Sequence, residues 1–97
     1  MSIQKKSIYL AKLNSIRSVV EKATDKQKQD LIGTNLANEF NKLLDEIGKE
    51  YSDLKSSLPA KITSVGPFSD MQKADMNYTD LEIFTETVMS LLNLINN

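Results

Sequence analysis

The sequence predicts an all-α protein, folded as a small bundle of three principal helices. Apolar residues recur every three or four positions over most of the chain, and this spacing places them on one side of an α-helix. Capping signals and prolines divide the chain into predicted helices at about residues 3–23, 25–58 and 70–96, with a crossover loop at 59–69. At 97 residues the chain is expected to form a single helical domain, 1–97, around one hydrophobic core.

The first predicted helix carries a broad apolar arc. At about 100° per residue, one side of this helix collects Ile8, Tyr9, Leu13, Ile16, Val19, Val20 and Ala23. Leu10 is the one apolar residue that falls outside the arc. We therefore expect the arc to face the core and Leu10 to lie away from it.

The second predicted helix is the longest. Thr24 and Gln27 have the spacing of a capping box, which predicts a helix start near Asp25. Pro59 ends the helix, because the residue before a proline is disfavoured in the α conformation. The apolar stripe between them comprises Ile32, Leu36, Phe40, Leu43, Ile47, Tyr51, Leu54 and Leu58.

Two glycines are the weak points of this long helix, since each costs about 1 kcal/mol relative to alanine in a helix interior. The helix either runs unbroken through Gly48 or bends there. The stripe keeps its phase across Gly48, which favours a continuous helix. Gly33 lies close to the apolar arc, and we expect it to allow close packing against the first helix.

The third predicted helix has two possible starts. Ser69–Gln72 and Thr79–Glu82 both have capping-box spacing, so the helix begins at Asp70 or at Asp80. Its main apolar stripe comprises Leu81, Phe84, Val88, Leu92 and Ile95.

A second, narrower apolar row on the third helix is the main functional signal. Met76, Ile83 and Leu94 form this row, and Phe84 and Leu91 bridge it to the main stripe. Either the third helix is buried around most of its circumference, or the row contacts another protein, because monomers rarely expose contiguous apolar patches. The row predicts a protein interface made by Met76, Ile83, Phe84, Leu91 and Leu94, most simply in a homodimer.

Charge is distributed unevenly, which suggests a second hypothesis. Residues 1–28 carry seven basic side chains against two acidic ones, whereas residues 70–97 carry one against five. A basic N-terminal helix could contact nucleic acid through Lys5, Lys6, Lys12 and Arg17. These side chains scatter around the helix without interleaved aromatic residues, so nucleic-acid binding is the weaker alternative.

Composition excludes several classes of site. The chain has no Cys and no His, which removes thiol chemistry, ordinary zinc sites and the usual general base near neutral pH. No catalytic motif emerges, and neither a cofactor nor a small-molecule substrate is indicated. The sequence shows neither a signal peptide nor a membrane-spanning segment, so we expect a cytoplasmic location.

Together these observations predict a non-catalytic helical interaction module. It would act as a homodimer, an adaptor, an assembly subunit or an inhibitor that docks through its third helix. The abundance of Lys, Asn and Ile suits a bacterial or phage genome.

Overall fold

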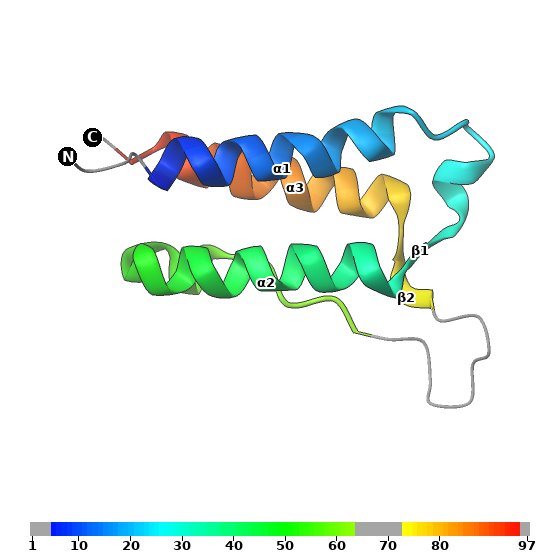
Figure 1. The fold of residues 1–97 in the computed structure, drawn as a ribbon. Helices are drawn as coiled ribbons and strands as arrows, with labels where there is room; N and C mark the ends of the chain where they lie inside the picture. Colours follow the sequence, from blue (N-terminus) through cyan, green and yellow to red (C-terminus); the bar gives the residue numbers. More distant parts are fainter. Residues whose placement is uncertain (1–4, 64–72, 96–97) are drawn as a thin grey trace.

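Helices make up most of the fold in the computed structural model, which describes residues 5–63 and 73–95 (Figure 1). In chain order the described elements are α1 (Lys5–Glu21), the 3₁₀ helix η1 (Gln27–Gln29), β1 (Leu31–Gly33), α2 (Thr34–Glu50), the 3₁₀ helix η2 (Ser52–Ser57), β2 (Lys73–Asn77) and α3 (Tyr78–Asn93). The prediction of a mostly helical protein is confirmed. The sequence did not predict the small antiparallel sheet that β1 and β2 form. The predicted crossover loop lies partly outside the described residues.

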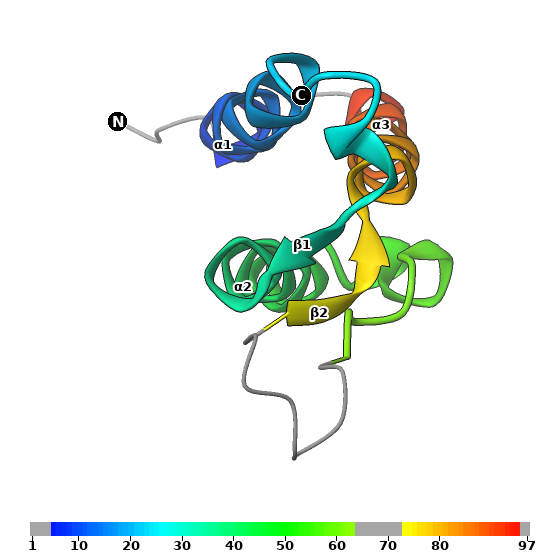
Figure 2. The same ribbon diagram turned by 90° about the vertical axis from the view of Figure 1, so that its right-hand side faces the viewer.

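The three α-helices lie roughly along one direction. α1 and α3 run antiparallel, and their backbones approach each other closely along their length (Figure 1). α2 lies across from this pair, and the returning chain of η2 fills the remaining corner, as the end view in Figure 2 shows. The sheet closes one end of the bundle.

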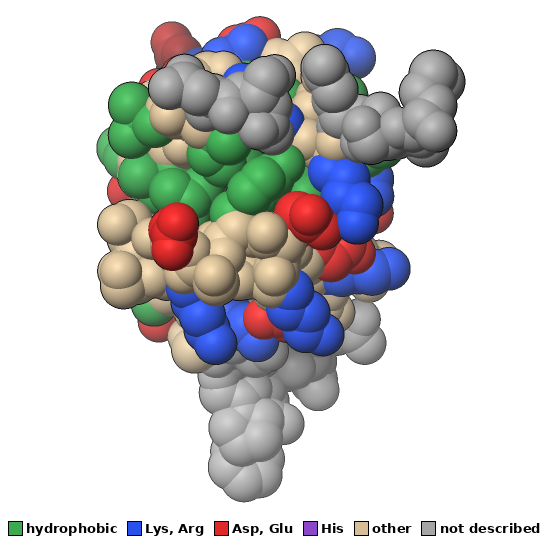
Figure 3. Space-filling model, turned by 90° about the vertical axis from the view of Figure 1, so that its left-hand side faces the viewer, with side chains coloured by type: hydrophobic (Ala, Val, Ile, Leu, Met, Phe, Trp, Pro, Cys, Tyr) green, Lys and Arg blue, Asp and Glu red, His purple; other side chains and the backbone are tan. Residues whose placement is uncertain are grey.

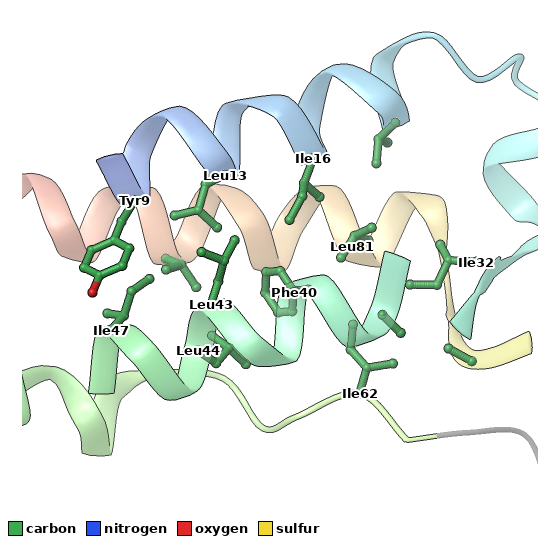
Figure 4. Packing of buried hydrophobic residues seen from close by; sticks show 14 of the residues in the cluster. Tyr9, Leu13, Ile16, Ile32, Phe40, Leu43, Leu44, Ile47, Ile62 and Leu81 are labelled. Atoms are coloured by element: carbon green, nitrogen blue, oxygen red, sulfur yellow. The ribbon is translucent and has the colours of Figure 1, made fainter. Parts of the chain in front are cut away.

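A single apolar cluster fills the space between the helices. Phe40 and Leu13 are completely buried at its centre, and Figure 4 shows the labelled side chains of α1, α2 and α3 converging there. Tyr9 closes one end of the cluster and packs edge-to-face against Tyr51, with ring centroids 6.3 Å apart. The predicted apolar stripes of the helices therefore supply most of this core.

The arc predicted for the first helix is only partly correct. Tyr9, Leu13, Ile16 and Val20 are buried, as expected. Two other members of the arc, Ile8 and Val19, remain 40% and 48% exposed. Leu10 was expected to lie away from the core but packs against it, because α3 lies on that flank of α1.

The predicted start of the second helix is wrong by nine residues. The Thr24–Gln27 capping box forms, with the Gln27 amide donating to Thr24 Oγ1 at 3.1 Å and the Thr24 amide donating to Gln27 Oε1 at 2.9 Å. It caps only the short turn at η1. The chain then extends into β1, and α2 begins at Thr34 after the extended backbone of Gly33.

The second helix also ends earlier than predicted. It runs through Gly48, as expected, but the backbone of Tyr51 leaves the helical region (φ −125°, ψ 75°) and η2 follows. The helix at 25–58 is thus three separate helical segments. Gly33 is not a close-packing glycine, since no atom lies within 4 Å of the place where its Cβ would stand.

The third helix begins at neither predicted position. α3 starts at Tyr78, and Asn77 caps it by accepting a hydrogen bond from the Asp80 amide at 2.8 Å. Residues 73–77 were expected to be helical if the helix started at Asp70, but they form β2. The Ser69–Gln72 capping box lies outside the described residues.

Candidate interaction surface

The outward side of α3 carries Ile83, Thr87 and Ser90, and Leu94, the residue directly after the helix, continues their row. We call these four residues the outer row. At about 100° per residue, it lies roughly opposite the buried residues of α3. Ile83 is 54% exposed and Leu94 is 73% exposed, although both are large apolar side chains. Thr87 and Ser90 lie between them and are also exposed.

The start of α3 is fixed by contacts with the segment before β1. The Tyr78 amide donates to the Asp30 carbonyl at 3.3 Å, and Thr79 Oγ1 donates to the Lys28 carbonyl at 3.2 Å. Together with the Asn77 cap, these bonds hold the first turn of the helix. These hydrogen bonds fix the position of the first turn of α3, the helix on which the outer row lies.

The five predicted interface residues do not share one environment. Ile83 and Leu94 are exposed, whereas Met76 and Phe84 are half-buried and pack against the core. Leu91 is also half-buried. Met76 belongs to β2 and does not extend the row along α3. The predicted row thus contracts to Ile83 and Leu94, with Phe84 and Leu91 on its flank.

Hydrophobic side chains also gather at one end of the molecule. Figure 3 looks at the end where α1 begins and where α2 and α3 finish, and a hydrophobic area occupies the upper part of this view. The half-buried Leu91 lies in the last turn of α3, and Leu94 and the half-buried Ile95 follow the helix at this end. The outer row therefore reaches this end of the molecule with Leu94.

A groove between α1 and α2, which the sequence did not predict, is a second apolar surface. It has a volume of about 380 Å³. Its apolar lining comes from Ile16, Val19, Leu36 and Leu43, and its polar lining comes from Lys12, Ser15, Glu39, Lys42 and Glu46. The feature of the sequence that could have indicated this groove is the wide apolar arc on α1. Val19 lies at the edge of that arc and lines the groove.

The basic side chains of α1 are mostly engaged within the chain. Lys5 Nζ lies 2.8 Å from Glu50 Oε1, and this hydrogen bond, with the charge of Glu50, raises the pKa of Lys5 above its ordinary 10.5. Lys6 Nζ donates to the Ile95 carbonyl at 3.0 Å. The structure therefore does not gather the cations predicted to contact nucleic acid into one free patch.

The other two predicted cations are also dispersed. Arg17 donates to Asn14 Oδ1 at 2.7 Å and lies 3.6 Å from Glu21. Lys12 lines the groove between α1 and α2. The four predicted cations therefore make separate contacts and do not form one continuous basic face on α1.

The described residues, 5–63 and 73–95, contain no cluster of three or more acidic side chains placed to hold a metal ion. In the same part of the chain, no helix is both long enough and apolar enough to cross a bilayer. No protein-family model, curated protein or solved structure matches the chain.

Proposed function

We propose that this protein is a non-catalytic interaction module that self-associates through the outer row of α3. The observation that carries the proposal is the exposure of Ile83 and Leu94 on the side of the helix opposite the core. Burying an exposed side chain of this size contributes about 1.5–3 kcal/mol, so a second copy that covers both residues lowers the free energy of the pair.

The expected dimer is weak and depends on concentration. Two copies would together bury four such side chains, which contributes at most about 6–12 kcal/mol. Association costs about 4–15 kcal/mol in lost translational and rotational freedom. The two ranges overlap, so the equilibrium is sensitive to protein concentration. A module of this kind suits a cytoplasmic adaptor or assembly subunit, whose contacts form and dissolve.

Light scattering on the purified full chain, over about 5–500 μM, tests the proposal in the range where weak dimers dissociate. The mean mass should rise toward that of a dimer. Ile83→Asp and Leu94→Asp should each keep the mass at that of a monomer, because a buried carboxylate is costly. Val19→Asp is the matched control, since Val19 is an exposed apolar residue on α1.

Two results would contradict self-association through α3. One is a monomer at every concentration. The other is a dimer that persists in both α3 variants or dissociates equally in the Val19 control. Circular dichroism of each variant verifies that the helical fold is retained.

A further inference from the structure

We infer that the partner surface for the outer row is the same row of a second copy, with the two α3 helices packed antiparallel around a twofold axis. This inference rests on the proposed self-association and specifies its geometry. It commits to a closed, isologous dimer, in which one patch meets its own copy.

The spacing of the outer row is the same when it is read in either chain direction. Its four positions are separated by four, three and four residues, so reversing the chain direction returns the same pattern. In an antiparallel pair, Ile83 then faces the partner's Leu94, and Thr87 faces the partner's Ser90. Spacings of three and four are those of the a and d positions in a coiled coil, which keep one seam directed at the partner. The seam is about 16 Å long at 1.5 Å per residue.

The middle of the seam suits close helix contact. Thr87 and Ser90 are small, and helices approach more closely where the side chains between them are small. Thr87 Oγ1 donates to the Ile83 carbonyl at 2.8 Å, so its hydrogen bond is made within its own helix. Burying Thr87 against a partner therefore leaves no unpaired hydroxyl proton, which would otherwise cost free energy.

The residues beside the seam are also compatible with this pairing. On one side, half-buried Phe84 lies level with the partner's Leu91, so apolar meets apolar. On the other side, Glu86 lies close to the partner's Asn93, and both are exposed. No pair of like charges meets on either side.

Charge separation favours the antiparallel direction over the parallel one. The acidic residues of α3, Asp80, Glu82 and Glu86, all lie in its first nine residues, whereas residues 87–97 contain no ionisable side chain. An antiparallel partner places its uncharged half beside these acids. A parallel partner would place the same acids beside one another, and like charges at close range repel.

The groove between α1 and α2 is the competing site for the outer row. Docking there would join unlike surfaces and generate an open-ended assembly instead of a closed dimer. The groove presents Glu39 and Glu46. Lys12 and Lys42 also line the groove, so its charges balance and do not decide between the two sites. The symmetric spacing of the outer row favours pairing of α3 with itself.

Disulfide cross-linking tests the register, because the chain has no natural Cys. Thr87→Cys and Ser90→Cys proteins are mixed, equilibrated and oxidised, and mass spectrometry separates the mixed dimer from the two same-variant dimers. The mixed dimer should exceed the half-share of a random mixture and form several-fold faster than the dimer of a Ser7→Cys control. Ser7 is exposed on α1.

Different cross-linking results would contradict the antiparallel register and the proposed self-association. Predominance of the same-variant dimers overturns the antiparallel register while leaving self-association intact. Preferential cross-linking of Ser90→Cys with Ser15→Cys, in the groove, overturns it in favour of an open-ended assembly. Cross-linking no faster than the Ser7 control, with a monomer in light scattering, contradicts the proposed function itself.

A charge exchange provides a second test without cysteine. Asn93→Glu places a carboxylate beside the partner's Glu86 and should weaken the dimer by about two- to thirty-fold, as expected for two exposed charge contacts. Adding Glu86→Lys should restore or exceed the original affinity. Residues 86 and 93 are two turns apart on their own helix, so the rescue must act between copies. A double variant no tighter than Asn93→Glu alone overturns the register.

Discussion

Asn41 holds the backbone of Ile62 with both ends of its side-chain amide. Asn41 Nδ2 donates to the Ile62 carbonyl at 2.9 Å, and the Ile62 amide donates back to Asn41 Oδ1 at 2.8 Å. This pair of bonds reproduces the pattern that a neighbouring strand would make. It fastens the chain after η2 to α2 and places the Ile62 side chain in the core.

Asn41→Ala should destabilise the protein by about 1–3 kcal/mol, because two hydrogen bonds are lost and the half-buried Ile62 backbone is left without partners. Urea unfolding measures the change. Asn38→Ala is the matched control, since Asn38 is exposed on the same helix and its substitution should change stability by about 0.5 kcal/mol or less. Equal losses in the two variants would contradict this function of Asn41.

Thr85→Val should stabilise the fold. Thr85 is completely buried on the core side of α3, and within the described residues its hydroxyl has no hydrogen-bond partner. Valine has nearly the same shape without the hydroxyl, so we expect a gain of about 1 kcal/mol in thermal or urea unfolding. Thr85→Ser should lose stability, because it keeps the hydroxyl and removes the methyl group. A loss of stability in Thr85→Val would show that the hydroxyl is satisfied in solution.

Gly48→Ala should also stabilise the protein. Gly48 lies inside α2, and an added Cβ would stand 3.6 Å from Leu58 Cδ1 and 3.7 Å from Lys55 Cγ, which are ordinary contact distances. Alanine should therefore add about 0.5–1 kcal/mol through helix propensity. Gly33→Ala, at an open position outside the helix interior, should change stability less. Destabilisation of Gly48→Ala would indicate tighter packing under η2 than these distances allow.

Stability should fall at alkaline pH. Burial, with the nearby charges of Glu46 and Glu50, raises the pKa of Tyr9 above its ordinary 10.0, and the bond to Glu50 raises that of Lys5 above 10.5. In both cases the protonated form is favoured in the folded state, so folded protein binds more protons than unfolded protein above pH 10.0. The stabilisation is complete below the unfolded pKa and is lost as pH rises through the folded pKa.

Urea unfolding at about pH 9 and about pH 11 measures this loss on either side of the tyrosine and lysine titrations. Tyr9→Phe removes one of the two groups, so its stability should decline less over the same interval. Tyrosine absorbance should also show that the Tyr9 ring ionises at higher pH in the folded protein than in urea, a signal that Tyr9→Phe removes. If the free energy of unfolding of Tyr9→Phe falls as much between these two pH values as that of the unmodified protein, Tyr9 does not contribute to the loss of stability.

The sequence predicted which residues form the core more reliably than it predicted the helix ends. Phe40, Leu43 and Ile47 are buried on α2, as their spacing indicated. Ile32 has the same spacing and is buried too, yet it belongs to β1. A buried position is set by the apolar pattern, whereas the extended backbone at Ile32 depends on pairing with residues 73–77, which are remote in sequence.

The end of α2 was missed for a related reason. Leu54 and Leu58 continue the three-to-four spacing and both pack partly buried against the core, but Leu54 lies in the 3₁₀ helix η2 and Leu58 directly follows it. The outer row was predicted only in part. Ile83 and Leu94 are exposed, which is one of the two alternatives that the sequence left open for this row. The small polar residues between them were not part of the prediction.

The hydrogen bond from Lys6 to the Ile95 carbonyl brings the first turn of α1 against the end of α3. A circular permutant in which a short linker joins these two ends, with the chain reopened at the exposed turn around Asp25, would keep all of the apolar contacts in the interior. The packing of the helices therefore does not determine the order in which the chain connects them. This architecture is defined by which sides of its helices meet, and several chain connectivities could satisfy it.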